Sequence, residues 1–323
     1  MATAALKSVE ILDLRHFGSQ DLRPLLEEEV ELWDQMLGWD YSGSAEMVLR
    51  YMDARILPGY VAVEGRQVLG YSFFVYEGSK GIIGDLFVSG GGKTQRNGSD
   101  PLEHRLLTHV IETLEESPGV HRIESQLLPH KTGRVARPFL EAGFRRHPRL
   151  FMVWPLRPTA METGATQDIE FRPWREEDFQ SAAAVITAAY RGHVDSEIND
   201  QYRTVAGSLR FLNNIVRFPG CGTFDGESSF VAVHRPTQLM VGLILCSKVR
   251  HDVGHVTQVC VAPEFRGRKL GERLIAACHA SLLRRKCTSL SLTVTEANAN
   301  AVGLYKRLGF TVTHVFDAFV WEG

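Results

Sequence analysis

The chain has 323 residues, of which 44% are hydrophobic and 23% are charged. This length favours two domains over one, and the apolar fraction is large enough for substantial cores. Its 36 basic and 38 acidic side chains give a formal charge of −2, which argues against a partner recruited by overall charge, whether nucleic acid or an anionic membrane.

Five cysteines lie in the second half of the chain, and none has the CxxC or Cys/His spacing of a metal site. An odd number of cysteines without such a framework is typical of reduced thiols in the cytoplasm, and we expect no metal. The first residues show no basic segment followed by an apolar one, and no apolar run approaches the ~18 residues that a membrane span requires. The sequence therefore predicts a cytoplasmic protein that is neither secreted nor inserted in a membrane.

One sequence pattern occurs twice in the chain. Val61-Ala62-Val63 recurs as Val231-Ala232-Val233, and each copy is followed by a turn and a second apolar run that contains a glycine. Further along, Phe139-Leu-Glu-Ala-Gly-Phe144 matches Tyr305-Lys-Arg-Leu-Gly-Phe310. Matches that keep their order indicate a tandem duplication.

The segment between the two copies contains Pro, Gly and Thr and has no apolar period. Such a composition is typical of an exposed linker. We therefore expect a first domain at 1–155, a linker at 156–168 and a second domain at 169–323.

Apolar residues at helical spacing alternate with strand-like runs, and the order is similar in both halves. This alternation predicts an α/β fold in which helices flank a mixed central sheet in each half. In chain order, the elements expected in the second half are a strand near Ile169–Arg172, helices at Glu176–Tyr190 and around Tyr202–Val216, strands at Phe230–His234, Met240–Val249 and His255–Val261, a helix at Leu270–Leu283, a strand at Leu290–Val294, a helix at Asn298–Leu308 and a final strand at Phe310–Trp321.

The segment from Val259 to Leu274 is a β-branched strand, a loop with Gly and Arg, and the start of an apolar-striped helix. Backbone N–H groups at a helix N-terminus bind anions such as a pyrophosphate, and glycines let the backbone approach the oxygens closely. Between Phe265 and Lys286 there are seven basic residues and one acid, a local charge of +6. The alternative is a solvated helix face that is basic by composition. The loop has neither the Walker A nor the dinucleotide-binding spacing.

Two motifs in this half resemble the acyl-CoA core of the GNAT N-acetyltransferase superfamily. They are Val259-Cys-Val-Ala-Pro-Glu-Phe-Arg266-Gly-Arg-Lys-Leu-Gly271 and Asn298-Ala-Asn-Ala-Val-Gly-Leu-Tyr305-Lys-Arg-Leu-Gly-Phe310. The resemblance covers about two-thirds of the second half, and the first half resembles the same fold more faintly. The chain thus resembles a tandem GNAT protein with two GNAT-like domains, a layout shared with mycothiol synthases. The resemblance implies acetyl-CoA as co-substrate.

The family's pyrophosphate motif is [QR]-x-x-G-x-[GA], and here Arg266 and Gly271 fit while Lys269 stands at the first glycine. The preceding strand is expected to pair with the pantetheine arm and to aim a main-chain N–H at the thioester oxygen. Asn298 is expected to touch the CoA arm or to cap a helix. The residues that the resemblance assigns to CoA binding are Val259, Cys260, Val261, Arg266, Gly267, Arg268, Lys269, Leu270, Gly271 and Asn298.

Tyr305 falls where many family members carry the general acid, and a phenol can donate the proton that the departing thiolate needs. His255 falls where some relatives carry a catalytic Glu. Strand alternation predicts that it shares a face with Val259 and Val261, so it is the candidate base. A surface histidine in a turn, with a water chain as base, is the alternative. Thr293 stands at a second Glu position and cannot accept the proton.

The resemblance implies direct attack of a primary amine on acetyl-CoA in a ternary complex. Cys260 is expected to face away from Val259 and Val261, which disfavours an acyl-cysteine route. Asp195, Glu197 and Asp200 lie where the family builds its acceptor site, and they either attract the amine or are solvated loop carboxylates. The acceptor stays open between a small molecule and a protein amine. The alternative function is a non-catalytic acyl-CoA-binding or scaffold protein.

The corresponding loop of the first half, 89–100, carries no matching Arg-Gly frame. Gln95-x-x-Gly98-x-Asp100 is similar to the motif but ends in an acid, which repels phosphate. Between Ser89 and Glu116 there are three basic and five acidic residues, a local charge of −2. Phe139 replaces the tyrosine. We therefore expect the first half to keep the fold without acyl-CoA chemistry.

Overall fold

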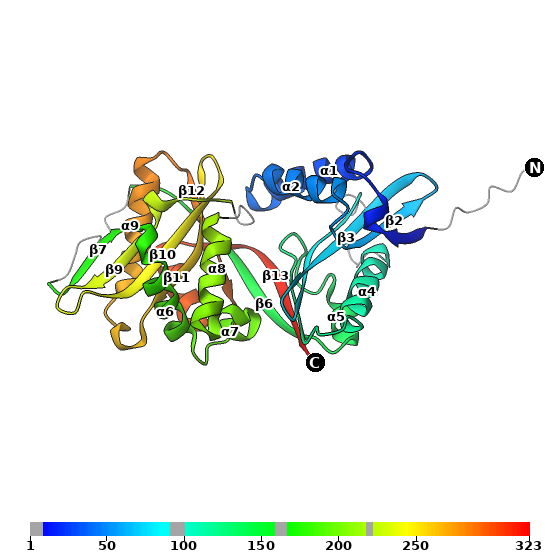
Figure 1. Ribbon diagram of the computed structural model, residues 1–323. Helices are drawn as coiled ribbons and strands as arrows, with labels where there is room; N and C mark the ends of the chain where they lie inside the picture. The colour runs from blue at the N-terminus through cyan, green and yellow to red at the C-terminus, as the bar shows by residue number, and fades with distance from the viewer. Residues whose placement is uncertain (1–8, 91–100, 159–166, 218–221) are drawn as a thin grey trace, which may run out of the picture. The chain divides into compact units, whose positions relative to one another are not determined.

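A computed structural model of the chain describes residues 9–90, 101–158, 167–217 and 222–323, and it divides into two compact units. Unit 1 comprises Met1–Leu37, Tyr41–Pro148 and Phe316–Gly323, and unit 2 comprises Gly38–Asp40 and Arg149–Val315. Each unit is a sheet with helices on both faces, as the alternating sequence pattern predicts (Figure 1).

In unit 1 the strand order is β1-β2-β3-β4-β5-β13. Apolar side chains of α1 and α2 pack on one face of this sheet, and those of α4 and α5 pack on the other. The elements are β1 (Glu10–Asp13), α1 (Ser19–Leu37), α2 (Ser42–Asp53), β2 (Gly59–Glu64), β3 (Gln67–Glu77), β4 (Lys80–Val88), α4 (Pro101–Glu115), β5 (Arg122–Gln126), α5 (Ala136–Glu141) and the later part of β13 (Thr311–Glu322).

In unit 2 the strand order is β6-β12-β11-β10-β9-β7, and β8 pairs with β10. Side chains of α9 and α10 pack on one face, and those of α6 and α8 pack on the other. The elements are β6 (Arg145–Pro155), β7 (Ile169–Pro173), α6 (Phe179–Tyr190), α7 (Asp195–Ile198), α8 (Val205–Arg217), β8 (Thr223–Phe224), β9 (Phe230–His234), β10 (Leu239–Arg250), β11 (Val253–Val261), α9 (Leu270–Arg284), β12 (Ser289–Thr295) and α10 (Ala299–Leu308).

The tandem duplication is visible in matched backbone contacts. β4 and β11 each pair in parallel with the strand that follows the next helix, and the second residue of each is a glycine, Gly81 or Gly254. A Cβ at Gly81 would lie 2.6 Å from Leu114 Cδ2 of α4, and one at Gly254 would lie 2.6 Å from Leu282 Cδ1 of α9. The two halves therefore pack helix on sheet at the same point with the same pair of residue types.

The units differ from the sequence halves 1–155 and 169–323 because the last strand of each half joins the other unit. In β13, Ala318–Glu322 pairs with β5 in unit 1, whereas in β6, Arg149–Pro155 pairs with β12 in unit 2. Composition marks where a chain leaves a domain, but it does not reveal which sheet edge a terminal strand joins. The central part of the expected linker, 159–166, lies outside the described residues.

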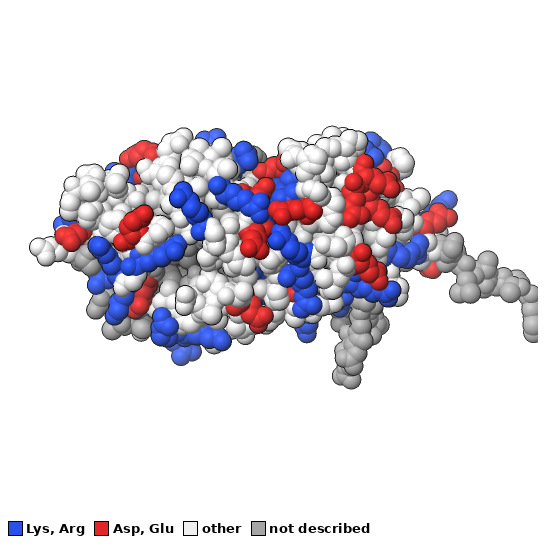
Figure 2. Space-filling view, turned by 90° about the horizontal axis from the view of Figure 1, so that it is seen from below, with Lys and Arg blue, Asp and Glu red and all other residues white. Residues whose placement is uncertain are grey.

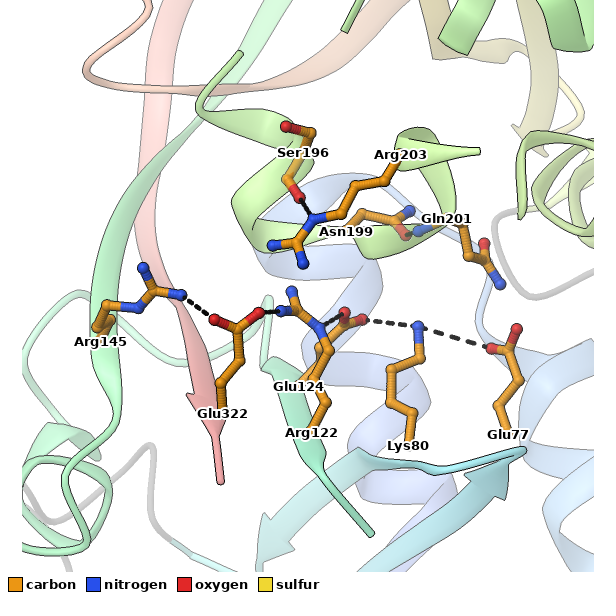
Figure 3. A network of polar contacts seen from close by, with 10 residues as sticks. All are labelled: Glu77, Lys80, Arg122, Glu124, Arg145, Ser196, Asn199, Gln201, Arg203 and Glu322. Atoms are coloured by element: carbon orange, nitrogen blue, oxygen red, sulfur yellow. Dashed lines mark hydrogen bonds and ion pairs between the residues drawn. The ribbon is translucent and has the colours of Figure 1, made fainter. Parts of the chain in front are cut away.

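A row of alternating charges crosses unit 1 from Glu77 at the end of β3 to Arg145 at the start of β6 (Figure 3). Lys80 Nζ lies 3.2 Å from Glu124 Oε2, and Arg122 Nε donates to Glu124 Oε1 at 2.6 Å. All three side chains are almost completely buried, so each charge depends on its neighbours for compensation. In order, the members of this charge row are Glu77, Lys80, Glu124, Arg122, Glu322 and Arg145.

Within the described residues, no helix combines the length and the apolar character that crossing a membrane requires. On the face shown in Figure 2, Lys and Arg side chains are interspersed with Asp and Glu side chains. This distribution agrees with the nearly balanced formal charge of the sequence.

Candidate active site

The loop between β11 and α9 leads directly into the N-terminus of that helix. Gly267 and Lys269 both have left-handed backbone, with φ of +77° and +58°, and Lys269 is the residue before the first helical turn. A Cβ at Gly267 would meet open space, so glycine serves the backbone conformation there and is not required for room. The N–H groups of the first turn of α9 are consequently presented at the end of the sheet, where they can bind an anion.

A cavity of about 520 Å³ lies between β11, β12 and the helices α6, α9 and α10. Parallel pairing of β11 with β12 ends at Val256 and Leu292, and the two strands beyond that point both line the cavity. We call the opening between these two strands the strand splay. The residues that line this first cavity include Tyr190, His193, Asp195, Gln258, Val259, Cys260, Val261, Arg266, Gly267, Gly271, Thr293, Asn298, Asn300, Leu304 and Tyr305.

A second cavity of about 500 Å³ adjoins the first at the N-terminus of α9. Gly267, Gly271 and Leu304 line both cavities, and Lys269 and Arg307 line the second alone. The two cavities together extend from the strand splay to the loop before α9, which we call the basic loop after its residues Arg266, Arg268 and Lys269.

Two of the basic loop side chains are held by neighbouring residues. Arg266 Nη2 donates to the carbonyl oxygen of Ala189 at 2.6 Å, which ties the loop to the end of α6. The Arg268 guanidinium lies 4.9 Å from the centre of the Phe265 ring. Arg266 therefore positions the loop in addition to contributing charge.

Tyr305 is buried in α10, and it lines the first cavity. Burial raises the pKa of its phenol above the ordinary value, with smaller contributions from Asp195 and Cys260. No described residue forms a hydrogen bond with its hydroxyl group, so the hydroxyl can bind a ligand. A raised pKa keeps the phenol protonated at neutral pH, as a proton donor must be.

His255 lies on the opposite face of β11 from Val259 and Val261, so the prediction that they share a face is wrong. A β-bulge at Thr257 is the reason, because Leu245 pairs with Gln258 and the next residue of β10 pairs with Val256. One extra residue inverts the alternation for the rest of the strand. His255 does not line either cavity.

The imidazole of His255 is enclosed by aromatic rings. Trp39 packs edge-on against it with ring centres 4.8 Å apart, and Phe151 stacks on it at 6.1 Å. Its Nδ1 forms a hydrogen bond with Ser291 Oγ at 2.9 Å. Burial lowers the pKa of His255 to about 3, so the ring is a poor proton acceptor at neutral pH.

Cys260 faces the α6 side of the sheet, away from Val259 and Val261, as the alternation predicts. Burial raises the pKa of its thiol to about 12. A thiol that stays protonated is a weak nucleophile.

Of the three carboxylates expected near the acceptor, Asp195 lines the first cavity. It accepts a hydrogen bond from Thr295 Oγ1, and Arg149 Nη1 lies 3.8 Å from its Oδ1. His193 Nδ1 lies 3.5 Å from Asp195 Oδ2 and accepts the Asp195 backbone N–H at 3.1 Å. The carboxylate is thus fixed at the cavity wall and only partly neutralised.

Asn298 caps α10, since its side-chain oxygen accepts the N–H of Ala301 at 3.3 Å, and it also lines the first cavity. Both expected roles are compatible with this position.

Sequence reasoning missed Tyr190, Gln258 and Asn300 as cavity residues. Only the fold brings Tyr190 to β11, and no motif singles out Gln258.

At the matching place in unit 1, the N–H of Leu86 is bonded to the preceding side chain, as that of Val259 is in unit 2, but the contact of the carbonyl oxygen and the aromatic residue differ. The carbonyl oxygen of Leu86 on β4 forms a hydrogen bond with His130 Nε2 at 2.9 Å, and its N–H donates to Asp85 Oδ1 at 2.8 Å. Phe139, the counterpart of Tyr305, is buried and stacks on Phe319. The loop 91–100, with the degenerate motif, lies outside the described residues.

Among the residues that the structure describes, no group of three or more His, Cys, Asp or Glu side chains is arranged to hold a metal ion.

Residues 196–310 match the profile of the Acetyltransferase (GNAT) family. A mycothiol acetyltransferase of Corynebacterium jeikeium is 46% identical over 61 residues, which are 19% of this chain and 18% of that protein. N-alpha-acetyltransferase 30 of Dictyostelium discoideum is 31% identical over 75 residues, 22% of this chain and 40% of that protein. The chain therefore matches less than half the length of either relative.

Several solved structures match almost the whole chain. A GCN5-related N-acetyltransferase from Sphaerobacter thermophilus has a TM-score of 0.64 at 17% identity and covers 98% of this chain and 95% of its own. A tandem GNAT protein from the clavulanic acid biosynthesis pathway has a TM-score of 0.58 at 13% identity and covers 98% of both chains. These matches show that the chain has the fold of GNAT proteins, including a tandem one, and the profile of the Acetyltransferase (GNAT) family matches residues 196–310 within it.

Proposed function

We propose that the protein is an N-acetyltransferase that moves an acetyl group from acetyl-CoA to a primary amine, with its active site in unit 2. The observation that supports this best is the continuous site formed by the strand splay, the basic loop and the N-terminus of α9. The strand splay matches the thioester and the pantetheine arm. The basic loop and the N-terminus of α9 match the pyrophosphate and the nucleotide.

The residues present fit acetyl-CoA. Beyond Val256, β11 no longer pairs with β12, so its main-chain groups on that side are open to pantetheine, and the first turn of α9 offers N–H groups to the pyrophosphate. Lys269 and Arg307 supply positive charge beside that turn. Bound acetyl-CoA would supply an activated acyl carbonyl and a thiolate leaving group.

Tyr305 is proposed as the general acid. The amine nitrogen forms a bond to the acyl carbon while the carbon–sulfur bond breaks, and the Tyr305 hydroxyl gives its proton to the leaving sulfur. The proton lost by the attacking nitrogen returns through water to the tyrosinate, so the step balances. His255 is left out as the base because it is buried away from the cavity with a lowered pKa.

The acceptor is proposed to be a primary amine that enters as an ammonium ion. Asp195 offers a carboxylate to this cation at the cavity wall, and the partial neutralisation by Arg149 suits an acceptor of a single charge. The ammonium must lose a proton before it can attack, and we propose that water takes it.

Unit 1 is proposed to have no acyl transfer activity. The backbone carbonyl of Leu86, the counterpart of Val259, is already bonded to the His130 side chain, and Phe139 stands in place of the proposed general acid Tyr305. Its role would then be structural.

Calorimetric titration of acetyl-CoA into the full chain tests this proposal, followed by thiol release with a panel of amines. One site per chain is expected, and Arg266→Glu should abolish it. The matched control is Arg137→Glu, the same charge reversal at an exposed helical position of unit 1. No binding to the unmodified chain would refute the proposal, and two sites would refute the assignment to unit 2. Binding with no turnover on any amine would favour a non-catalytic acyl-CoA-binding protein.

A further inference from the structure

The side chain of Gln258 is the most unusual polar group in the first cavity. It follows the bulge residue Thr257 on β11, is 4% exposed, and lines the cavity. A bulge re-aims the side chains next to it, and here it places an amide beside the strand splay.

Two donors fix the orientation of this amide. Tyr190 O–H donates to Gln258 Oε1 at 2.8 Å, and the backbone N–H of Val259 donates to the same oxygen at 3.0 Å. Rotating the amide by 180° would set its NH₂ group against the Val259 N–H, a contact between two donors. The oxygen therefore faces these groups and the NH₂ group faces elsewhere.

The NH₂ group has no acceptor among the described residues. Gln258 Nε2 is completely buried and makes no hydrogen bond. A buried donor without a partner is costly, and native structures rarely keep one without a reason. Because the residue lines the cavity, a ligand oxygen there can satisfy it.

The hydrogen bond at Val259 strengthens this reading. An acyl transfer site needs donors at the carbonyl oxygen, where negative charge develops. The main-chain N–H of Val259 lies in the splayed part of β11, but Gln258 Oε1 already occupies it. The unpaired amide N–H of Gln258 is a donor that is available at this point.

We propose that Gln258 is a catalytic residue whose Nε2 donates a hydrogen bond to the acyl carbonyl oxygen of the bound thioester, and that Tyr190 positions it. The inference rests on the proposed function. The hydrogen bond is made in the ground state and becomes stronger as the oxygen gains charge. It differs from the main-chain donor that the family resemblance predicts.

The test compares acetyl-CoA with CoA, which lacks the carbonyl, by titration into the full chain. Gln258→Glu keeps an oxygen for Tyr190 and Val259 but removes the donor. We expect this variant to bind CoA as the unmodified protein does and to lose the several-fold preference for acetyl-CoA that one hydrogen bond provides. Its kcat should fall about 100-fold and recover partly at low pH, where a protonated carboxyl can donate.

Gln258→Leu is the second variant, for the case in which a buried Glu prevents folding. The matched control is Ser247→Ala, because Ser247 Oγ is also a buried polar atom without a partner but does not line either cavity. The control should keep the preference for acetyl-CoA. If folded Gln258 variants keep that preference, a different donor serves the carbonyl and the inference is wrong. If the unmodified chain binds neither compound, the proposed function itself fails.

Discussion

Tyr305 combines burial with a hydroxyl group that no described residue binds, and this combination suits a proton donor. Substitution by phenylalanine keeps the ring packing on Phe310 and removes only the hydroxyl. We expect Tyr305→Phe to lower kcat by about 10²- to 10⁴-fold, the usual contribution of general acid catalysis, with little change in the affinity for CoA.

The pH dependence provides a second test of Tyr305. Because burial raises its pKa, the phenol stays protonated to a higher pH than a free tyrosine, whose pKa is ~10. The decline of kcat that reports its deprotonation should therefore begin above pH ~10. A decline near pH 7 that disappears in Tyr305→Phe would contradict the burial argument.

His255 is predicted to affect stability more than catalysis. Its pKa of about 3 lies below the ordinary 6.5, so the folded state resists a proton that the unfolded chain accepts. The stability that depends on the neutral ring is complete above pH 6.5 and is lost as the pH falls toward 3. Between pH 6.5 and 5 the loss should be roughly 2 kcal/mol.

Urea unfolding of the unmodified chain and of His255→Asn at several pH values measures this effect. The variant should lose less stability on acidification, and its kcat should stay within a few-fold of the original. A kcat that falls 100-fold in this variant would restore His255 as the base.

At the scale of elements, the β11–α9 loop depends on left-handed backbone at two residues. Gly267→Ala places a Cβ in open space but strains a φ of +77°, at a cost of about 1 kcal/mol. We expect a several-fold weaker affinity for CoA by calorimetry. The control is Gly43→Ala in α2, which also meets open space, has no positive φ and should leave CoA binding unchanged.

The charge row, which runs from β3 to β6, carries a stability prediction for unit 1. Glu124→Ala leaves Lys80 and Arg122 buried without their shared carboxylate, and such a loss costs about 3 to 5 kcal/mol. Glu77→Ala removes a partner that lies 3.9 Å from Lys80, so it should cost less than 1 kcal/mol. Denaturant unfolding of both variants measures the difference, and equal losses would show that the row contributes no compensation.

Much of unit 2 could be predicted from the sequence because its signals are local. The apolar stripes place α9 and α10 within a few residues, and the glycines and the Tyr305 motif identify the cavity that the structure contains. The bulge at Thr257 could not be predicted, because an alternating run looks the same with one extra residue in it. That single residue moved His255 to the other face and brought Gln258 into the site.

At the scale of the whole molecule, the sequence predicted two domains of the same fold, but it assigned the last strand of each domain to the wrong sheet. The sheet edge with which a terminal strand pairs depends on the tertiary fold, and it cannot be predicted from the sequence of the strand itself. β6 and β13 were each assigned to the half in which they are encoded, whereas each completes the sheet of the other unit. Each sequence half therefore contains a sheet edge that a strand from the other half covers.

This exchange predicts how the protein responds to a cut in the linker. Cleavage at a protease site inserted between residues 158 and 167 leaves the pairings β5–β13 and β6–β12 intact, so the fragments should elute together in gel filtration and still bind acetyl-CoA. Expressed alone, 167–323 lacks β6, and the exposed edge of β12 should make it aggregate. Separate elution of the fragments, with binding by 167–323 alone, would show that the exchanged strands are dispensable.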